Sequence, residues 1–392
     1  MPALPAAGFA SVVNRRAVLI LLSRFNTKKM NVRRASRVSL GTLERGPARL
    51  RRIDLMFMRS KALKVAALAL LLLALNLSTS AAALAQDKKK KEKKSLPPGK
   101  AVLWEEPRDI DSHDLLLGPG GARMRPEVSR LEFVKEEKGG WSKKYRVRDA
   151  AGKVWVAKLS KEAQSETAAV RLVWAVGYPT EINYLVPCVR IEGAPQPKEA
   201  EACAGGGYRN VHLEARPEGI KRPEGIKRLD EWSWVGSPFE GRREMQGLKV
   251  LMVFLNNWDT KDDNNVVFHV QQRGTDELQY IISDLGATLG KTSGGRLWKL
   301  KRSRSAPEDY AEAKFIDRVE KGYVRFSYAG VNTGMLDKIT VADARWLGGW
   351  LARLSERQIG DAFRAANYTP EEVRIFTGAV RARLRELTTL PK

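Results

Sequence analysis

Residues 143–177 read KKYRVRDAAGKVWVAKLSKEAQSETAAVRLVWAVG, and this stretch decides the fold that the sequence predicts. Its first half has two strand-like runs, 143–148 and 153–159, separated by the turn sequence DAAG. Its second half, Glu162 to Gly177, places valines and a tryptophan at helical spacing and ends at a glycine. A further strand-like run precedes it at 129–135. The sequence therefore predicts three antiparallel strands followed by a helix.

A lysine and a glutamate in this stretch form the first candidate pair. Lys158 lies on the third predicted strand, and Glu166 lies in the helix that follows. A strand lysine usually faces solvent, but a lysine on a third strand paired with a glutamate on the next helix is how protein kinases hold nucleotide phosphates. Lys161 is an alternative phosphate-binding lysine, although it falls at the end of the strand.

A polar knot forms the second feature, and it reads Asp259-Thr260-Lys261-Asp262-Asp263-Asn264. It follows an apolar, helix-like run at 248–255 and precedes strand-like segments at 266–270 and 280–283. In phosphoryl transfer an aspartate accepts the proton of the attacking hydroxyl, a lysine offsets phosphoryl charge, and an asparagine holds magnesium. Asp259, Lys261 and Asn264 have that spacing, with Asn265 as an alternative metal ligand. A polar turn with a capping aspartate is the competing interpretation.

The third feature is Asp284-Leu285-Gly286, which follows the apolar strand-like residues Tyr280-Ile281-Ile282. A carboxylate placed just after a strand and before a glycine can bind a divalent cation that bridges phosphate oxygens. The tripeptide is common by chance. Its position after the other two features gives it weight.

In this order the three features resemble the protein-kinase-like superfamily, nearer its atypical members than ordinary Ser/Thr kinases. Those members are the CotH spore-coat kinases, the secretory-pathway kinases, HipA and the phosphatidylinositol-kinase-like proteins, and the resemblance covers about residues 130 to 290. It implies an α+β, two-lobed fold whose N-lobe is a small antiparallel β-sheet plus a helix and whose C-lobe is mainly helical. It also implies ATP with Mg²⁺ or Mn²⁺ in the cleft. The implied roles are phosphate binding by Lys158 and Glu166, catalysis by Asp259 and Lys261, and metal binding by Asn264 and Asp284.

The sequence departs from the ordinary kinase pattern at several points. No G-x-G-x-x-G loop is present, and only Lys138-Gly139-Gly140-Trp141-Ser142 stands near its place. Asn256-Asn257-Trp258 precedes Asp259 where ordinary kinases have His-Arg, and Leu285 replaces the usual phenylalanine. Ala306-Pro307-Glu308 follows as the end of an activation segment would, but we interpret it as coincidence. Two functions therefore stay open: an active phosphotransferase and a non-catalytic, pseudokinase-like binding module of the cell envelope.

The domain organisation follows from shifts in composition along the chain. The expected segments are a non-structural extension at 1–57, a signal peptide at 58–85, a basic linker at 86–100, an N-lobe at 101–240 and a C-lobe at 241–392. Residues 191–240, rich in Gly, Pro and charge, are expected to form a loop insertion that contains the tandem copy RPEGIK-RPEGIK at 216–227. Capping boxes at Ser355 and Thr369 predict the starts of two C-terminal helices, to which we assign no chemistry.

The segment before the predicted linker has the three parts of a secretory signal. Basic Arg59, Lys61 and Lys64 precede an apolar run at 65–75, and Ala83-Leu84-Ala85 forms a small-x-small cleavage site. We expect cleavage after Ala85 and a periplasmic or extracellular protein without a permanent membrane span, the alternative being an inner-membrane protein anchored by an uncleaved signal. For residues 1–57 we prefer a start codon assigned too early over an organellar transit sequence.

The net charge falls sharply if that signal is removed. The whole chain has a formal charge of +24, but residues 1–85 hold fifteen Lys or Arg against Glu44 and Asp54 only, which leaves +11. Much of this excess lies at Lys88–Lys94, which we interpret as a solvated spacer. Contact with anionic lipid or an envelope polymer is the alternative, while nucleic-acid binding has no supporting motif. The expected substrate is a hydroxyl group on an unidentified envelope or secreted protein or polysaccharide.

Cysteine and histidine content limits the other chemistries. Cys188 and Cys203 are the only cysteines, and the sequence leaves open whether they form a disulfide. A metal site built on them is unfavourable, because His212 is the only histidine nearby. The chain contains neither a G-x-S-x-G nor an H-E-x-x-H motif, which argues against the hydrolase classes that these motifs mark.

Overall fold

The structure is a computed structural model, and it describes residues 96–137, 143–195, 200–215, 226–272, 275–292 and 302–391. The chain divides into two compact units, residues 1–91 and 92–392, and the description that follows concerns the second. The expected extension and signal peptide, Lys88–Lys94, the Lys138–Ser142 segment and most of the RPEGIK repeat lie outside the described residues. The described part is mixed α and β, with three sheets and six α-helices.

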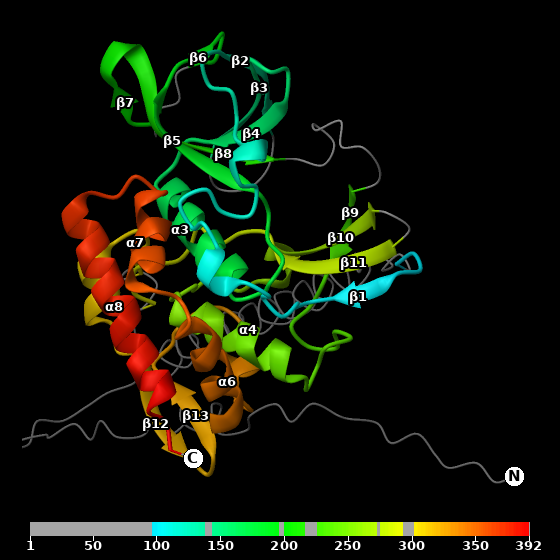
Figure 1. Ribbon diagram of the computed structural model, residues 1–392, viewed down its shortest axis with the longest axis vertical. Helices are drawn as coiled ribbons and strands as arrows, with labels where there is room; N and C mark the ends of the chain where they lie inside the picture. Colours follow the sequence, from blue (N-terminus) through cyan, green and yellow to red (C-terminus); the bar gives the residue numbers. More distant parts are fainter. Residues whose placement is uncertain are drawn as a thin grey trace, which may run out of the picture. The chain divides into compact units, whose positions relative to one another are not determined.

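The largest sheet forms from the stretch that decided the sequence prediction (Figure 1). Its strands, in spatial order, are β5 (Asn183–Val189), β8 (Gly207–Ala215), β4 (Val154–Lys158), β3 (Lys144–Asp149), β2 (Leu131–Glu137) and β6 (Ile191–Glu192), with β7 (Ala202–Cys203) paired to β8. The pairing is antiparallel except between β2 and β6. The three predicted strands are therefore confirmed as β2, β3 and β4.

Helix α3 (Glu162–Ala175) follows β4, as predicted, and contacts β5 and β8. The sheet has a hydrophobic cluster of its own, in which Trp155, Val147 and Leu213 are fully buried. The buried residues of α3 belong instead to a second, larger cluster that it shares with the C-terminal helices. Helix α3 thus connects the sheet that ends in Lys158 to the rest of the described unit.

The prediction of a loop insertion at 191–240 is wrong for part of that range. Strand β8 lies between β4 and β5 inside the sheet, and β9 (Ile226–Glu231) belongs to a second sheet. The sequence on either side of β8 is rich in Gly, Pro and charged residues, and the last five residues of β8 are all buried, so the strand has no alternating pattern that would mark it. Cys188 and Cys203 form a disulfide that joins β5 to β7, with their Cα atoms 5.9 Å apart.

A second sheet has four strands in the order β1 (Lys100–Val102), β11 (Thr275–Ile282), β10 (Asn265–Gln272) and β9. Strands β10 and β11 form an antiparallel hairpin that pairs Asn265 with Ile282. Strand β1 pairs parallel to β11, as Figure 1 shows at the edge of this sheet. This hairpin brings the end of the Asp259–Asn264 knot beside the residues that lead to Asp284.

The rest of the unit is mainly helical. Its elements are α4 (Arg243–Phe254), α5 (Pro307–Glu312), the hairpin β12 (Ile316–Glu320) and β13 (Tyr323–Phe326), α6 (Val341–Leu351), α7 (Glu356–Arg364) and α8 (Pro370–Thr388). Both predicted capping boxes are confirmed, at Ser355 with Gln358 and at Thr369 with Glu372. No helix among the described residues is long and apolar enough to cross a membrane.

Candidate active site

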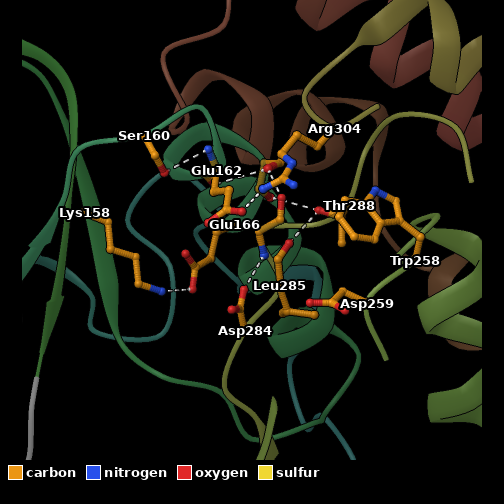
Figure 2. Close-up of polar contacts among 12 residues, drawn as sticks. Lys158, Ser160, Glu162, Glu166, Trp258, Asp259, Asp284, Leu285, Thr288 and Arg304 are labelled. Carbon is orange, nitrogen blue, oxygen red and sulfur yellow. Dashed lines mark hydrogen bonds and ion pairs between the residues drawn. The ribbon is translucent and has the colours of Figure 1, made fainter. Parts of the chain in front are cut away.

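Lys158 is the last residue of β4, and its side chain is 4% exposed. Its Nζ atom donates to Oε1 of Glu166 at 2.5 Å and lies 3.2 Å from Oε2 of Glu214 on β8. Figure 2 shows the Lys158 and Glu166 side chains pointing toward one another, with Asp284 close to both. The predicted pair of Lys158 and Glu166 is therefore a buried ion pair.

Two further carboxylates, Glu181 and Glu214, surround this pair and were missed by sequence reasoning. Oxygen atoms of Glu166, Glu181 and Glu214 lie within 4.8 Å of one another, and all three residues are buried. Such a group of oxygen ligands is suited to a hard divalent cation. Glu181 precedes β5, and Glu214 lies on β8, within the range 191–240 that was expected to be a loop. No local sequence signal marked either residue.

Burial and neighbouring charge shift the ionisation of the pair. Burial alone would lower the pKa of Lys158, but the carboxylates of Glu166 and Glu214, and then that of Asp284, raise it well above its ordinary value. Burial raises the pKa of Glu166, against the opposing effect of the Lys158 charge. Lys158 therefore stays charged over the whole physiological pH range. The Asp284 carboxylate is close enough to interact with this charge.

Asp284 lies two residues after the end of β11, and three contacts fix its surroundings. Its Oδ1 accepts a hydrogen bond from the amide of Gly286 at 3.1 Å. The neighbouring Ser283 hydroxyl donates to Glu181 at 3.1 Å, which links this turn to the carboxylate group. A Cβ atom at Gly286 would lie 2.8 Å from Cβ of Glu162, so only glycine allows α3 to approach this closely.

The Asp259 loop lies next to this turn. The Nζ atom of Lys261 is 2.8 Å from Oδ1 of Asp259, and Nδ2 of Asn264 donates to the Asp259 carbonyl at 2.7 Å. The amide of Ser283 donates to the carbonyl of Asn264 at 2.7 Å, which places Asn264 and Asp284 at adjacent strand ends. Hydrogen bonds thus join Asn264 to Asp259 and to Ser283, the neighbour of Asp284, and Asp284 interacts electrostatically with Lys158 and Glu166.

The two alternative residues are placed differently. Asn265 is fully buried inside the second sheet, where its Nδ2 donates to the Trp232 carbonyl at 3.1 Å. Lys161 is exposed and lines a shallow surface pocket with Arg209 and Asn210, apart from the Lys158 ion pair. Ala306-Pro307-Glu308 lies at the start of α5. Neither alternative residue joins the group formed by Lys158, Glu166 and Asp284.

Side chains on both flanks of the Asp259 loop hold it in place, and the sequence did not predict them. Trp258 stacks against the guanidinium groups of Arg302 and Arg304, each 5.0 Å from its ring, and Arg304 forms an ion pair with Glu162 on α3. On the other side, the Tyr328 hydroxyl donates to the Asn257 carbonyl at 2.5 Å, and burial raises the pKa of this tyrosine. The loop is thus fixed from both flanks by residues distant in sequence.

The chain was compared with protein families, with curated proteins and with solved structures. No protein-family model and no curated protein matches the chain. The chain is similar to the structure described as "Crystal structure of A Helicobacter pylori proinflammatory kinase CtkA", with 11% sequence identity and a TM-score of 0.37. That similarity covers 65% of this chain and 90% of the Helicobacter pylori chain. A likeness this distant carries no conclusion about activity, so the proposal below depends on the residues alone.

Proposed function

We propose that this protein is a kinase-like phosphotransferase that uses ATP with Mg²⁺ or Mn²⁺, and that its largest sheet and its mainly helical part belong to the two lobes of a kinase-like fold. One observation carries the proposal. The buried Lys158–Glu166 ion pair interacts electrostatically with Asp284, whose strand end is hydrogen-bonded to the end of the Asp259–Asn264 loop. These are the groups that phosphoryl transfer requires, in the arrangement that kinases use.

The donor atoms fit a divalent cation on the phosphates. Asn264 uses its amide N–H on the Asp259 carbonyl, so its amide oxygen and the Asp284 carboxylate are the two hard oxygen ligands on the adjacent strand ends. A metal bound there would offset the negative charge of the phosphates. Lys158 would contact the phosphates, and Glu166 would hold Lys158 in place.

Asp259 is proposed to orient the acceptor hydroxyl and take its proton. As the hydroxyl oxygen bonds to the γ-phosphorus, the bond from that phosphorus to the bridging oxygen breaks and ADP leaves with the bonding electrons. Lys261, which lies beside Asp259 and is about half exposed, would offset charge on the transferring group. The proposed acceptor is a hydroxyl group on an envelope or secreted molecule.

A binding module without transfer activity is the second candidate, and one observation favours it. The Lys158 ammonium is enclosed by Glu166 and Glu214, and these carboxylates oppose the approach of an anionic triphosphate. If this protein binds ATP, the binding should therefore require a divalent cation strictly. A pseudokinase-like module would instead use the basic segment Lys88–Lys94 on an anionic envelope polymer.

Thermal unfolding of the full chain with ATP, with and without Mg²⁺ or Mn²⁺, tests the nucleotide site. A ligand at about 100 times its dissociation constant stabilises the folded state by about 2.7 kcal/mol. We expect stabilisation only when ATP and metal are both present, and we expect Asp284→Asn to abolish it. Asp263→Asn is the matched control, because Asp263 is an exposed carboxylate in the same region. No shift in the wild type at millimolar nucleotide would remove the kinase proposal and leave the binding module.

Export is proposed on separate grounds, namely the signal-like segment at 58–85 and the disulfide between Cys188 and Cys203. Expression in a bacterium with a Sec pathway, followed by N-terminal sequencing of the periplasmic fraction, tests it. A new N-terminus at Gln86 is the expected result. Retention in the membrane fraction at full size would favour the uncleaved anchor.

A further inference from the structure

Arg383 on α8 is a buried charge in a helix to which the sequence assigned no chemistry. Its side chain is almost fully buried, and no carboxylate forms an ion pair with it among the residues that the structure describes. Its partners are oxygen atoms of the main chain and of one amide. The guanidinium donates to Phe254 O at 2.7 Å, Tyr310 O at 3.0 Å, Asn256 Oδ1 at 3.1 Å and Ala313 O at 3.2 Å.

These acceptors lie at the ends of two helices. Phe254 is the last residue of α4, and Tyr310 and Ala313 lie at the end of α5. The last carbonyls of a helix have no partner within the helix, and positive charge is favoured there. The guanidinium also lies 4.0 Å from the Tyr310 ring centroid, and the Tyr310 hydroxyl donates to Phe254 O at 2.8 Å. Arg383 therefore ties the C-terminal ends of α4 and α5 together.

The end of α4 is also the start of the Asp259 loop. Asn256 has a left-handed backbone, with φ of 51°, and the amides of Asn256 and Asn257 donate back to Val253 and Met252 at 2.9 and 2.8 Å. These two hydrogen bonds form a Schellman motif, which ends the helix and fixes the direction in which the chain leaves it. Asp259 follows only three residues after Asn256, so the direction of this turn determines where Asp259 lies.

The Asn256 side chain joins this turn to the segment that follows Asp284. Its Nδ2 donates to Gly290 O at 2.6 Å, while its Oδ1 accepts from Arg383. The amide of Leu289 donates in parallel to Leu255 O at 2.9 Å. One amide side chain, held by Arg383, therefore sets the spacing between the segment that leads to Asp259 and the segment that leads away from Asp284.

We propose that Arg383 is a positioning residue for phosphoryl transfer, because it fixes the turn at Asn256 from which the Asp259 loop begins. This inference rests on the proposed function, and Arg383 itself contacts no substrate. The role needs the planar guanidinium, because only that fork reaches four oxygen atoms on two segments at once. A lysine has a single ammonium group and cannot reproduce the geometry.

Kinetics of Arg383→Lys and Arg383→Met separate positioning from simple support of the fold. Misplacement of a reacting group by about 1 Å costs about 100-fold in rate. Well below the unfolding temperature, we expect kcat per folded molecule to fall about 10- to 100-fold, while KM for ATP changes little because Lys158 and Glu166 are untouched. Arg381→Met is the matched control, since Arg381 is on the same helix, is 42% exposed and pairs with Glu356.

Asn256→Gly gives a second test if the Arg383 variants fail to fold. Glycine adopts the left-handed conformation freely, so this change keeps the turn but removes the bonds to Arg383 and Gly290. The same loss of kcat is expected. Unchanged kcat in a folded Arg383→Lys protein, or in folded Asn256→Gly, would overturn the proposal.

A spectroscopic measurement tests the inference without any activity. The indole N–H of Trp258, next to Asp259, donates to Ser303 O at 3.1 Å, and its ¹⁵N resonance can be assigned with Trp258→Phe. Arg383→Lys should shift or broaden this resonance. The resonance of Trp155, in the hydrophobic cluster of the largest sheet, should stay unchanged. An unmoved Trp258 resonance would contradict positioning. If the wild type turns over no nucleotide, the proposed function fails. The Trp258 resonance of Arg383→Lys still shows whether Arg383 positions the Asp259 loop.

Discussion

Lys158 and Lys261 each pair with an acidic residue of the candidate site, but in opposite environments. The side chains of Lys158 and Glu166 are 4% and 3% exposed, whereas those of Lys261 and Asp259 are 52% and 20% exposed. A buried pair whose partner is removed leaves an uncompensated charge, while an exposed pair is screened by water. The first pair is therefore fixed by folding, and the second is free to rearrange when a substrate arrives.

The difference separates two tasks within the same site. The buried pair connects β4 to α3, so it contributes to stability as well as to the proposed phosphate binding. The exposed pair lies on a loop whose ends are held by other residues, namely Asn256 at the start and Asn264 at the end. Substitutions at the two pairs should therefore differ in their effect on stability: a change at the buried pair should lower both stability and activity, and a change at the exposed pair should lower mainly activity.

Asp259→Asn is expected to have the largest effect, and it should be confined to activity. The loss of a proton acceptor lowers rates by about 100- to 10,000-fold. Stability should hardly change, because an exposed ion pair contributes about 0 to 1 kcal/mol. Self-labelling or phosphate release from radiolabelled ATP, measured beside thermal unfolding, gives both numbers, with Asp263→Asn as the control. Unchanged transfer would show that this loop is not catalytic.

Lys158→Met should lower stability as well as the proposed transfer activity. Removing the cation leaves Glu166 and Glu214 buried without it, and breaking a buried pair typically costs about 3 to 5 kcal/mol of stability. Lys261→Met, the matched change at the exposed pair, should cost less than about 1 kcal/mol. Denaturant unfolding of both variants measures the contrast. Equal losses would show that burial does not distinguish the two pairs.

The sequence predicted the parts of this site that local patterns encode. The strand that ends at Lys158, the helix that carries Glu166 and the spacing from Asp259 to Asn264 are all local, and the structure pairs Lys158 with Glu166 and Asn264 with Asp259. Their chemical roles stay predictions. Cys188 and Cys203 are close enough to form the disulfide, which the sequence had left open.

The parts that were missed depend on contacts between distant segments. The sequence around β8 is rich in Gly and Pro, which hid this strand and Glu214 with it, because only the place of β8 between β4 and β5 makes its residues buried. In the sequence Arg383 looks like an ordinary helix arginine. The main-chain carbonyls to which it donates lie seventy or more residues away along the chain. No local pattern reports such partners.

Removal of the disulfide should lower stability without touching either lysine pair. It closes a loop with a sequence separation of 15, for which the expected contribution is about 3 kcal/mol. We expect the Cys188→Ser, Cys203→Ser double variant to lose that amount and to keep any metal-dependent stabilisation by ATP. Reductant should destabilise the wild type alone. Loss of the ATP effect in the double variant would show that β5 and β7 help to shape the site.

The smallest expected effect concerns the outer face of α3, away from its ion pair. His113 stacks on Trp174 of this helix, with ring centroids 4.5 Å apart, and burial lowers its pKa below 6.5. A hydrogen bond with the Ala175 backbone, and then the Asp109 carboxylate, oppose this shift only in part. The folded protein therefore takes up the His113 proton less readily than the unfolded chain, so this residue should weaken the fold as the pH falls through and below about 6.5.

Glu166 contributes a slope of the opposite sign, which makes a comparison of variants necessary. Because burial raises its pKa, the folded state holds the Glu166 proton more tightly, and this contribution to stability is lost as the pH rises above about 4.5. The wild-type curve is the sum of both slopes. Subtracting the curve of His113→Phe, measured by urea unfolding between about pH 5 and pH 7.5, isolates the histidine. If the difference in the free energy of unfolding between the two proteins does not change across this range, protonation of His113 does not weaken the fold. Helix α3 is then pH-sensitive only through its buried ion pair.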